Sequence, residues 1–132
     1  MPVLKIQKTI AAPAFSVFEA LTTQEKLQQW LATEVIAFPK EGTYAAFAYG
    51  FDLHFKVYLL KFDPGKKLVW EFVAGNVEWD GSLLSFTLNE KNGKTKLIFE
   101  HRRLKPNDKW ERWKKSWHEA FEKLKTLLEN RE

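Results

Sequence analysis

The first ten residues alternate apolar and polar side chains. Leu4, Ile6 and Ile10 stand at even spacing, and polar residues separate them. A period of two is typical of a strand that buries one face. Pro13 then breaks the strand and suits the first turn of a helix, where the amide hydrogen that proline lacks is not needed. The pattern therefore predicts a strand followed by a helix.

Two short helices are predicted next. Phe15, Phe18 and Leu21 recur every three residues, which places them on one side of a helix. Thr22-x-x-Glu25 has the form of a capping box and predicts that a second helix begins there. The apolar face of this second helix consists of Leu27, Trp30 and Leu31.

From Glu34 to His101 the period changes to two, and turn signals divide the segment. The clearest turns are Asp63-Pro64-Gly65-Lys66 and Asn92-Gly93, because asparagine–glycine is the strongest short hairpin signal. Alternating strands joined by tight turns predict an antiparallel sheet with one face covered. The predicted strands cover residues 35–38, 43–49, 51–62, 68–73, 84–89 and 95–101.

The last segment carries a helical pattern. Lys105-Pro106-Asn107-Asp108 is a start signal, and Asp108-x-x-Glu111 forms a second candidate capping box. This helix is the one element long and apolar enough to cover the sheet, so the sequence predicts one α+β domain over residues 1–132. Its apolar stripe recurs every three or four residues through Trp110, Trp113, Trp117, Phe121, Leu124 and Leu128.

Composition narrows the class of protein. The chain has 132 residues, which is the length of one domain, and it has no cysteine, which excludes disulfides and thiol chemistry. The net charge of +4 is too small for a nucleic-acid-binding surface, so no nucleic-acid partner is expected. Neither a signal peptide nor a stretch of about 18 apolar residues is apparent, and we therefore expect a cytoplasmic protein without a membrane span.

Several segments, in this order, carry a resemblance to a known superfamily. They are Ala11-Ala12-Pro13 with Val17-Phe18-Glu19-Ala20-Leu21-Thr22, Glu25-Lys26-Leu27-x-x-Trp30, Phe62-Asp63-Pro64-Gly65-Lys66-Lys67-Leu68-Val69-Trp70, Gly93-Lys94-Thr95-Lys96-Leu97 through His101, and Ser116-Trp117 with Leu124. Together they resemble the START/Bet v-like helix-grip superfamily, also called SRPBCC or polyketide-cyclase-like. Within it, they most resemble the family named for the C-terminal domain of the activator of heat-shock protein 90 ATPase. Ser116 departs from the pattern, because the family has a glycine there.

The resemblance implies a helix-grip fold. A curved antiparallel sheet of about six or seven strands would wrap around the long C-terminal helix, with two short helices after the first strand. It also implies a cavity between the sheet and the helix. The side chains expected to line this cavity and bind a ligand are Trp30 at its mouth, Tyr58, Trp70, Phe72, Phe86, Phe99 and His101 on the sheet, and Trp113, Trp117 and Phe121 on the helix.

The residues offer little conventional chemistry. The three histidines have no metal-ligand spacing, and neither a nucleophile elbow nor a phosphate-binding glycine pattern is present, so we expect no metal, no cofactor and no catalytic residue. His101 shares a face with Phe99, so it either contacts a ligand, acts as a base or bonds a backbone carbonyl. Asp52 and His54 are interpreted as a solvated edge, and His118 as a residue at the helix flank.

Three functions remain open. The first is binding of a small hydrophobic molecule, aromatic or acyl-like, in the cavity. The second, which the family name implies, is a chaperone-interacting module that docks its partner with charged residues: Glu111, Arg112, Lys114 and Lys115. The third is a cyclase- or aromatase-like enzyme with His101 and Tyr58 as its polar pair. The basic cluster at the start of the last helix is interpreted as a solvated face, because acidic residues are interleaved. The oligomeric state is not indicated.

Overall fold

The computed structural model describes residues 3–38, 40–49, 53–75, 79–104 and 109–129. These residues form a seven-stranded antiparallel sheet in the order β1-β7-β6-β5-β4-β3-β2, together with three helices. The elements are β1 (Leu4–Ile10), α1 (Ala14–Thr22), α2 (Gln24–Trp30), β2 (Glu34–Ile36), β3 (Tyr44–Tyr49), β4 (Leu53–Asp63), β5 (Lys67–Ala74), β6 (Leu83–Lys91), β7 (Lys94–Arg102) and α3 (Trp110–Glu129). This arrangement confirms the predicted α+β helix-grip fold.

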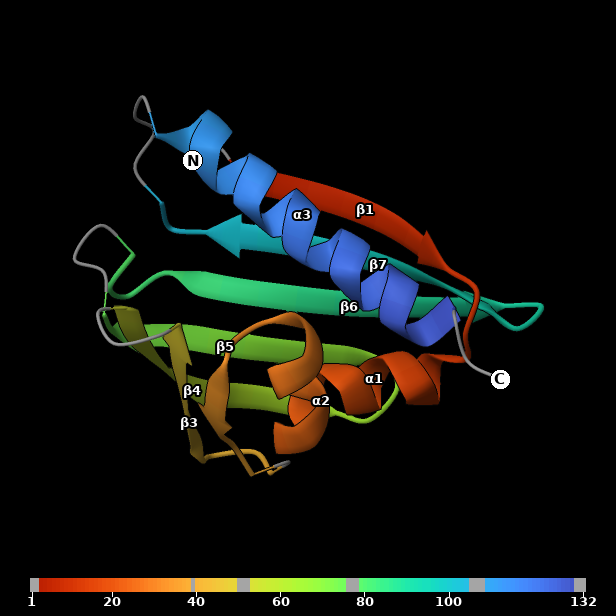
Figure 1. The fold of residues 1–132 in the computed structure, drawn as a ribbon, viewed down its shortest axis with the longest axis horizontal. Coiled ribbons are helices and arrows are strands. Elements are labelled where there is room, and N and C mark those ends of the chain that lie inside the picture. Colours follow the sequence, from red (N-terminus) through yellow and green to blue (C-terminus); the bar gives the residue numbers. More distant parts are fainter. Residues whose placement is uncertain (1–2, 39, 50–52, 76–78, 105–108, 130–132) are drawn as a thin grey trace.

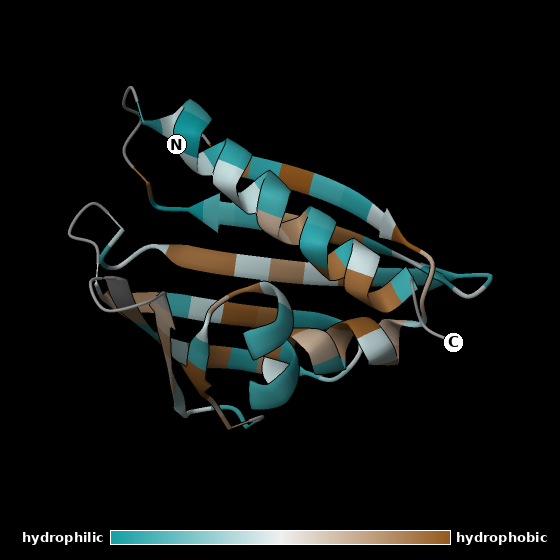
Figure 2. Ribbon diagram, viewed as in Figure 1, coloured by the Kyte–Doolittle hydropathy of each residue, from teal (hydrophilic) through white to brown (hydrophobic). Residues whose placement is uncertain are grey.

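The three helices lie on the same face of the sheet (Figure 1). The long helix α3 packs against β1, and α1 packs against β6 and β7. The side of α3 that faces away from the sheet is mostly hydrophilic (Figure 2), as the charged face of the predicted helix requires. No helix in the described part of the chain is both long and apolar enough to cross a membrane.

The core lies between the inner face of the sheet and the helices. Every second residue of β5, β6 and β7 points into it, as the period of two predicts, and α3 covers them with one stripe. The residues from these four elements that are buried in the core include Leu68, Trp70, Phe72, Leu84, Phe86, Leu88, Leu97, Phe99, Trp117, Phe121, Leu124 and Leu128. The sequence predicted each of these positions as apolar and periodic.

Both predicted hairpin turns are confirmed. The amide of Lys66 donates to the carbonyl of Asp63 at 3.0 Å, and this turn joins β4 to β5. Asn92 and Gly93 have φ values of 55° and 77°, which is the left-handed geometry of the two-residue hairpin that asparagine–glycine favours. They join β6 to β7.

Two details of the short helices differ from the prediction. Phe15 was expected on the same side as Phe18 and Leu21 but is 71% exposed, because the buried side of α1 is formed by Val17, Phe18 and Leu21 and leaves Phe15 outside it. The capping box predicted at Thr22 is wrong: Thr22 ends α1, and its hydroxyl donates to the carbonyl of Phe18 at 2.9 Å. The second candidate capping box includes Asp108, which lies outside the described residues.

Candidate functional site

A hollow of about 400 Å³ lies between the inner face of the sheet and the helices α2 and α3. We call it the aromatic pocket, because six of its twelve lining residues carry aromatic rings. Its polar groups, Ser116, Glu119 and Lys123, all come from α3. The full lining consists of Trp30, Leu31, Phe55, Phe72, Gly75, Trp79, Trp113, Ser116, Trp117, Glu119, Ala120 and Lys123.

Trp79 holds the wall of the aromatic pocket together. It lies between β5 and β6, and its ring stacks on Trp117 with centroids 5.9 Å apart and an interplanar angle of 17°. It also meets Trp113 and Phe72 edge to face, at 5.5 Å and 5.4 Å. Offset and edge-to-face pairs of this kind are favourable beyond the area they bury. The wall is therefore a packed set of rings contributed by the helix, the sheet and the connection between two strands.

The predicted cavity residues divide into three groups. Four of them line the aromatic pocket: Trp30, Phe72, Trp113 and Trp117. Five others lie in the core behind it and do not line it: Trp70, Phe86, Phe99, His101 and Phe121. The reason for this correction is ring packing, since the centroid distances are 4.8 Å for Trp70–Phe86, 5.2 Å for Phe86–Phe99 and 5.0 Å for Phe99–Phe121, which leaves no room between them.

Tyr58 forms the third group, and its predicted place in the cavity is wrong. Its neighbours Val57 and Leu59 are buried, so Tyr58 points to the opposite, outer face of the sheet. There its ring lies 5.0 Å from that of Tyr44. The polar pair of His101 and Tyr58 that a cyclase-like site would use is consequently not formed.

His101 is fully buried on β7, and its hydrogen-bond partner is a hydroxyl instead of a backbone carbonyl. Its Nε2 lies 2.8 Å from the Oγ of Ser82, which is also fully buried. Burial lowers the pKa of His101 to about 3, because desolvation disfavours the charged ring. The imidazole is therefore neutral at physiological pH. Its ring lies behind two rings that line the aromatic pocket, with centroids 4.8 Å from Trp79 and 6.2 Å from Trp117.

The other histidines stand apart from the pocket. His118 lies on α3, with its Nε2 3.3 Å from the Nζ of Lys8, which agrees with the expected place at the helix flank. His54 belongs to β4, but its side chain lies outside the described part of the structure, as does Asp52. The described residues contain no group of three metal-ligating side chains.

Sequence reasoning missed Trp79, Ser82 and Phe55. Trp79 stands just before Asp80-Gly81, between the predicted strands 68–73 and 84–89, where no periodic pattern places its ring on a face. Ser82 gave no signal, because its role depends on the strand opposite. Phe55 lies in a run of apolar residues in which the face of each side chain cannot be assigned from periodicity.

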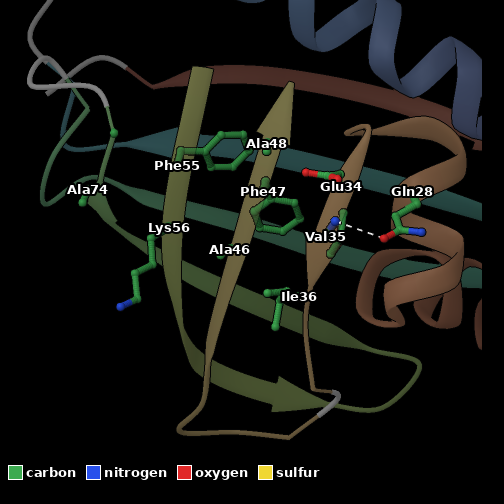
Figure 3. A pocket seen from close by; sticks show the side chains of 11 residues that line it. Gln28, Glu34, Val35, Ile36, Ala46, Phe47, Ala48, Phe55, Lys56 and Ala74 are labelled. Atoms are coloured by element: carbon green, nitrogen blue, oxygen red, sulfur yellow. Dashed lines mark hydrogen bonds between the residues drawn. The ribbon is translucent and has the colours of Figure 1, made fainter. Parts of the chain in front are cut away.

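A second, more open hollow of about 610 Å³ lies at the β2 edge of the sheet (Figure 3). Its wall includes three alanines and the exposed Ile36. The Oε1 of Gln28 accepts the amide hydrogen of Val35 at 3.1 Å and ties α2 to β2. Lys56 points away from the rings of Phe47 and Phe55 in Figure 3, so the hollow spans both faces of the strands. We consider the smaller aromatic pocket the better site, because its rings surround a space between the sheet and α3.

A third hollow of about 390 Å³ is lined by residues of β1 and α3. Lys5, Lys114 and Lys115 surround it, with Glu111 as the single acidic side chain in its lining. These groups are exposed, and an exposed cluster of lysines attracts anions only weakly at physiological ionic strength. It is the most basic of the hollows described here.

Comparison with known proteins agrees with this architecture. The family described as Activator of Hsp90 ATPase homolog 1-like protein matches residues 11–129. The chain belongs to this family. No curated protein matches the chain in sequence.

Solved structures share the family fold. The solution structure of the Aha1 dimer from Colwellia psychrerythraea is 24% identical, with a TM-score of 0.89 over 98% of each chain. Protein MLL2253 from Mesorhizobium loti is 23% identical, with a TM-score of 0.87 over 99% of each chain. DynU16, a protein of the dynemicin biosynthetic locus, is 21% identical with a TM-score of 0.81, and the match covers 97% of this chain and 47% of that one. Likeness at these identities establishes the fold.

Proposed function

We propose that this member of the Activator of Hsp90 ATPase homolog 1-like family is a single cytoplasmic domain that binds a small hydrophobic molecule, aromatic or acyl-like, in the aromatic pocket. The observation that carries the proposal is the pocket wall, which contains Trp30, Trp79, Trp113 and Trp117. Flat aromatic walls around a space of about 400 Å³ are typical of small-molecule sites, which are concave and mostly apolar with few polar groups.

The placement of the polar groups supports the same proposal. Glu119 and Lys123 stand one helical turn apart on α3 and line the pocket beside the rings. A ligand with an apolar body and one polar end would bury its body among the tryptophans and keep the polar end near these two charges. Of the predicted binding residues, the four that line the pocket remain the candidates for direct contact.

The experiment fills the pocket without creating a cavity. Ala120 lines the pocket on α3 and is half-buried, so Ala120→Phe places a phenyl ring in the space where the ligand would lie. Freshly purified, unstripped protein is analysed by native mass spectrometry, followed by organic extraction and mass analysis of the extract. The expected result is an extra mass on the natural protein that Ala120→Phe removes.

Thr126→Phe is the matched control. Thr126 is exposed on α3 and lines none of the hollows described above, so this variant carries the same added ring away from the pocket. It should keep the extra mass. Two results together would contradict the proposal. The natural protein would carry no extra mass, and Ala120→Phe would not weaken the binding of any added naphthyl compound.

A second candidate function is a chaperone-facing module, and the basic hollow between β1 and α3 is the observation that favours it. Lys114 and Lys115 would attract an acidic surface of a partner, and the family name suggests heat-shock protein 90 as that partner. The double variant Lys114→Glu/Lys115→Glu should abolish capture of a purified heat-shock protein 90, whereas Ala120→Phe should not affect it. Unchanged capture by the double variant would refute this docking surface.

A further inference from the structure

Three buried nitrogen atoms in the described part of the structure have no hydrogen-bond partner. They are the Nε1 atoms of Trp79 and Trp117 and the Nδ1 atom of His101. A buried polar group without a partner is unfavourable, and folded proteins contain only a few of them. Each such group therefore needs an explanation.

These three nitrogens belong to rings that touch one another. The centroid of Trp79 lies 4.8 Å from that of His101 and 5.9 Å from that of Trp117, and the centroids of His101 and Trp117 are 6.2 Å apart. Trp79 and Trp117 line the aromatic pocket, and His101 stands directly behind them. The rings that carry the unpartnered nitrogens are consequently gathered at one side of the pocket.

The hydrogen bond between Ser82 and His101 determines what the third nitrogen offers. Among the described residues, the hydroxyl of the fully buried Ser82 has Nε2 of His101 as its side-chain partner. We assign the hydroxyl hydrogen to the bond with Nε2, and in a neutral imidazole the ring hydrogen then resides on Nδ1. With this assignment all three unpartnered groups are N–H donors, since an indole nitrogen can only donate.

Trp30 shows that an unpartnered indole is not a general property of this pocket. Its ring also lines the pocket, but its Nε1 donates to the backbone carbonyl of Ala20 at 2.8 Å. Trp113 also lines the pocket, and its nitrogen is not among the buried unpartnered atoms. The missing acceptor is therefore specific to the wall that Trp79, Trp117 and His101 form.

We propose that the ligand of the aromatic pocket carries a carbonyl or carboxylate oxygen, and that this oxygen accepts hydrogen bonds from the indole N–H groups of Trp79 and Trp117, with the N–H of His101 behind them. The inference rests on the proposed function, because it assigns a chemical class to the ligand of the same pocket. Aryl ketones, quinones and aromatic or acyl carboxylates share this acceptor.

The three nitrogens are buried in this structure, so a ligand that reaches them has to displace one of the rings. Trp79 is the ring that moves, because it is half-buried whereas Trp117 and His101 are buried. An oxygen that enters beside Trp117 replaces ring contacts with hydrogen bonds in a water-poor space, where such bonds are electrostatically stronger than in water.

The test compares two probes of nearly the same shape. 2-Acetylnaphthalene carries a carbonyl oxygen, and 2-isopropenylnaphthalene has a CH₂ group in its place. Affinities are measured by titration with isotope-labelled protein, and the indole N–H resonances are followed in the same spectra. The ketone should bind about tenfold tighter than the alkene, as expected for one or two added hydrogen bonds.

The spectra provide a direct readout of the hydrogen bonds. The indole N–H resonances of Trp79 and Trp117 should move downfield with the ketone and not with the alkene. Both probes carry the same naphthalene ring, so comparing them cancels the effect of its ring currents on these resonances. The resonance of Trp30 should respond equally to both probes, because its N–H is already donated to Ala20. Assignments come from single Trp→Phe variants.

Variants separate the inference from the proposed function. Trp117→Phe should lower the affinity for the ketone about fivefold more than that for the alkene, whereas the control Trp113→Phe should lower both affinities alike. Equal affinities of the two probes, each weakened by Ala120→Phe, would refute the acceptor subsite and leave the pocket standing. Failure of both probes to bind would overturn the proposed function and, with it, the inference.

Discussion

His101 should make the protein less stable in mild acid. Burial lowers its pKa from 6.5 to about 3, so the folded protein keeps the imidazole neutral where the unfolded chain already binds a proton. Stability then rises with pH between these two values, because the unfolded state binds more protons than the folded state. The contribution is fully present above the unfolded pKa and is lost progressively as the pH falls toward 3.

The size of the effect follows from the two pKa values. At pH 5 the unfolded chain has gained a proton with a pKa of 6.5, which lowers the free energy of unfolding by about 2 kcal/mol relative to pH 8. The surroundings of the ring do not offset this loss, since Trp79, Phe99 and Trp117 contact it and carry no charge. Hydrogen bonds from Lys8 and Lys125 lower the pKa values of Glu122 and Glu129, so these groups also cost stability as the pH falls toward and below 4.5, but they do so equally in a variant that changes only His101.

The measurement is urea unfolding at pH 8 and pH 5, for the natural protein and for His101→Gln. The glutamine amide can still bond the hydroxyl of Ser82, but it does not titrate. The variant should be less stable at pH 8, because it loses the ring contacts of His101. Between pH 8 and pH 5, its free energy of unfolding should fall by about 2 kcal/mol less than that of the natural protein. Equal losses for both proteins would refute the argument that His101 is buried in its neutral form. Constant m values would show that the comparison concerns stability alone.

Two further pairs of substitutions test the local structure by urea unfolding. Gly93→Ala should lower the free energy of unfolding by roughly 1–2 kcal/mol, because φ is 77° at this position, although an added Cβ would meet no atom within 4 Å. Gly93→Asn should lower it less, because asparagine adopts this backbone conformation more readily. Equal losses would contradict a purely backbone effect. Phe18→Ala should cost about 3–5 kcal/mol, because Phe18 is 4% exposed, whereas Phe15→Ser should change stability by less than about 0.5 kcal/mol, because Phe15 is 71% exposed. A large loss for Phe15→Ser would contradict the orientation of α1.

The inner face of the sheet could be predicted wherever apolar and polar residues alternate. In β7, Leu97, Phe99 and His101 alternate with Lys96, Ile98 and Glu100, and the first three point inward as expected. In β4 the sequence is apolar on both faces, so periodicity does not determine whether Val57 or Tyr58 points inward. Pairing with the neighbouring strands determines it, and this pairing includes register shifts that no local pattern indicates.

The candidate site was predicted less completely than the fold. The resemblance indicated the right region, and four of ten predicted residues line the pocket. The remaining rings fill space that the sequence could not distinguish from a cavity, because packing depends on the shapes of several elements at once. Trp79 and Ser82 gain their roles from contacts with α3 and β7, which lie far from them in the sequence. Contacts between distant segments are invisible to a local pattern.

The pairing of β1 with β7 has a consequence for how the chain folds. The first strand of the structure lies next to the last strand, with Leu4 opposite His101. During synthesis, β1 therefore emerges from the ribosome long before its partner exists, and its apolar residues stay without a neighbouring strand until then. The hairpin of β6 and β7 needs only the Asn92-Gly93 turn and can form early. Closing the long loop back to β1 comes later, so we expect this non-local step to limit the folding rate.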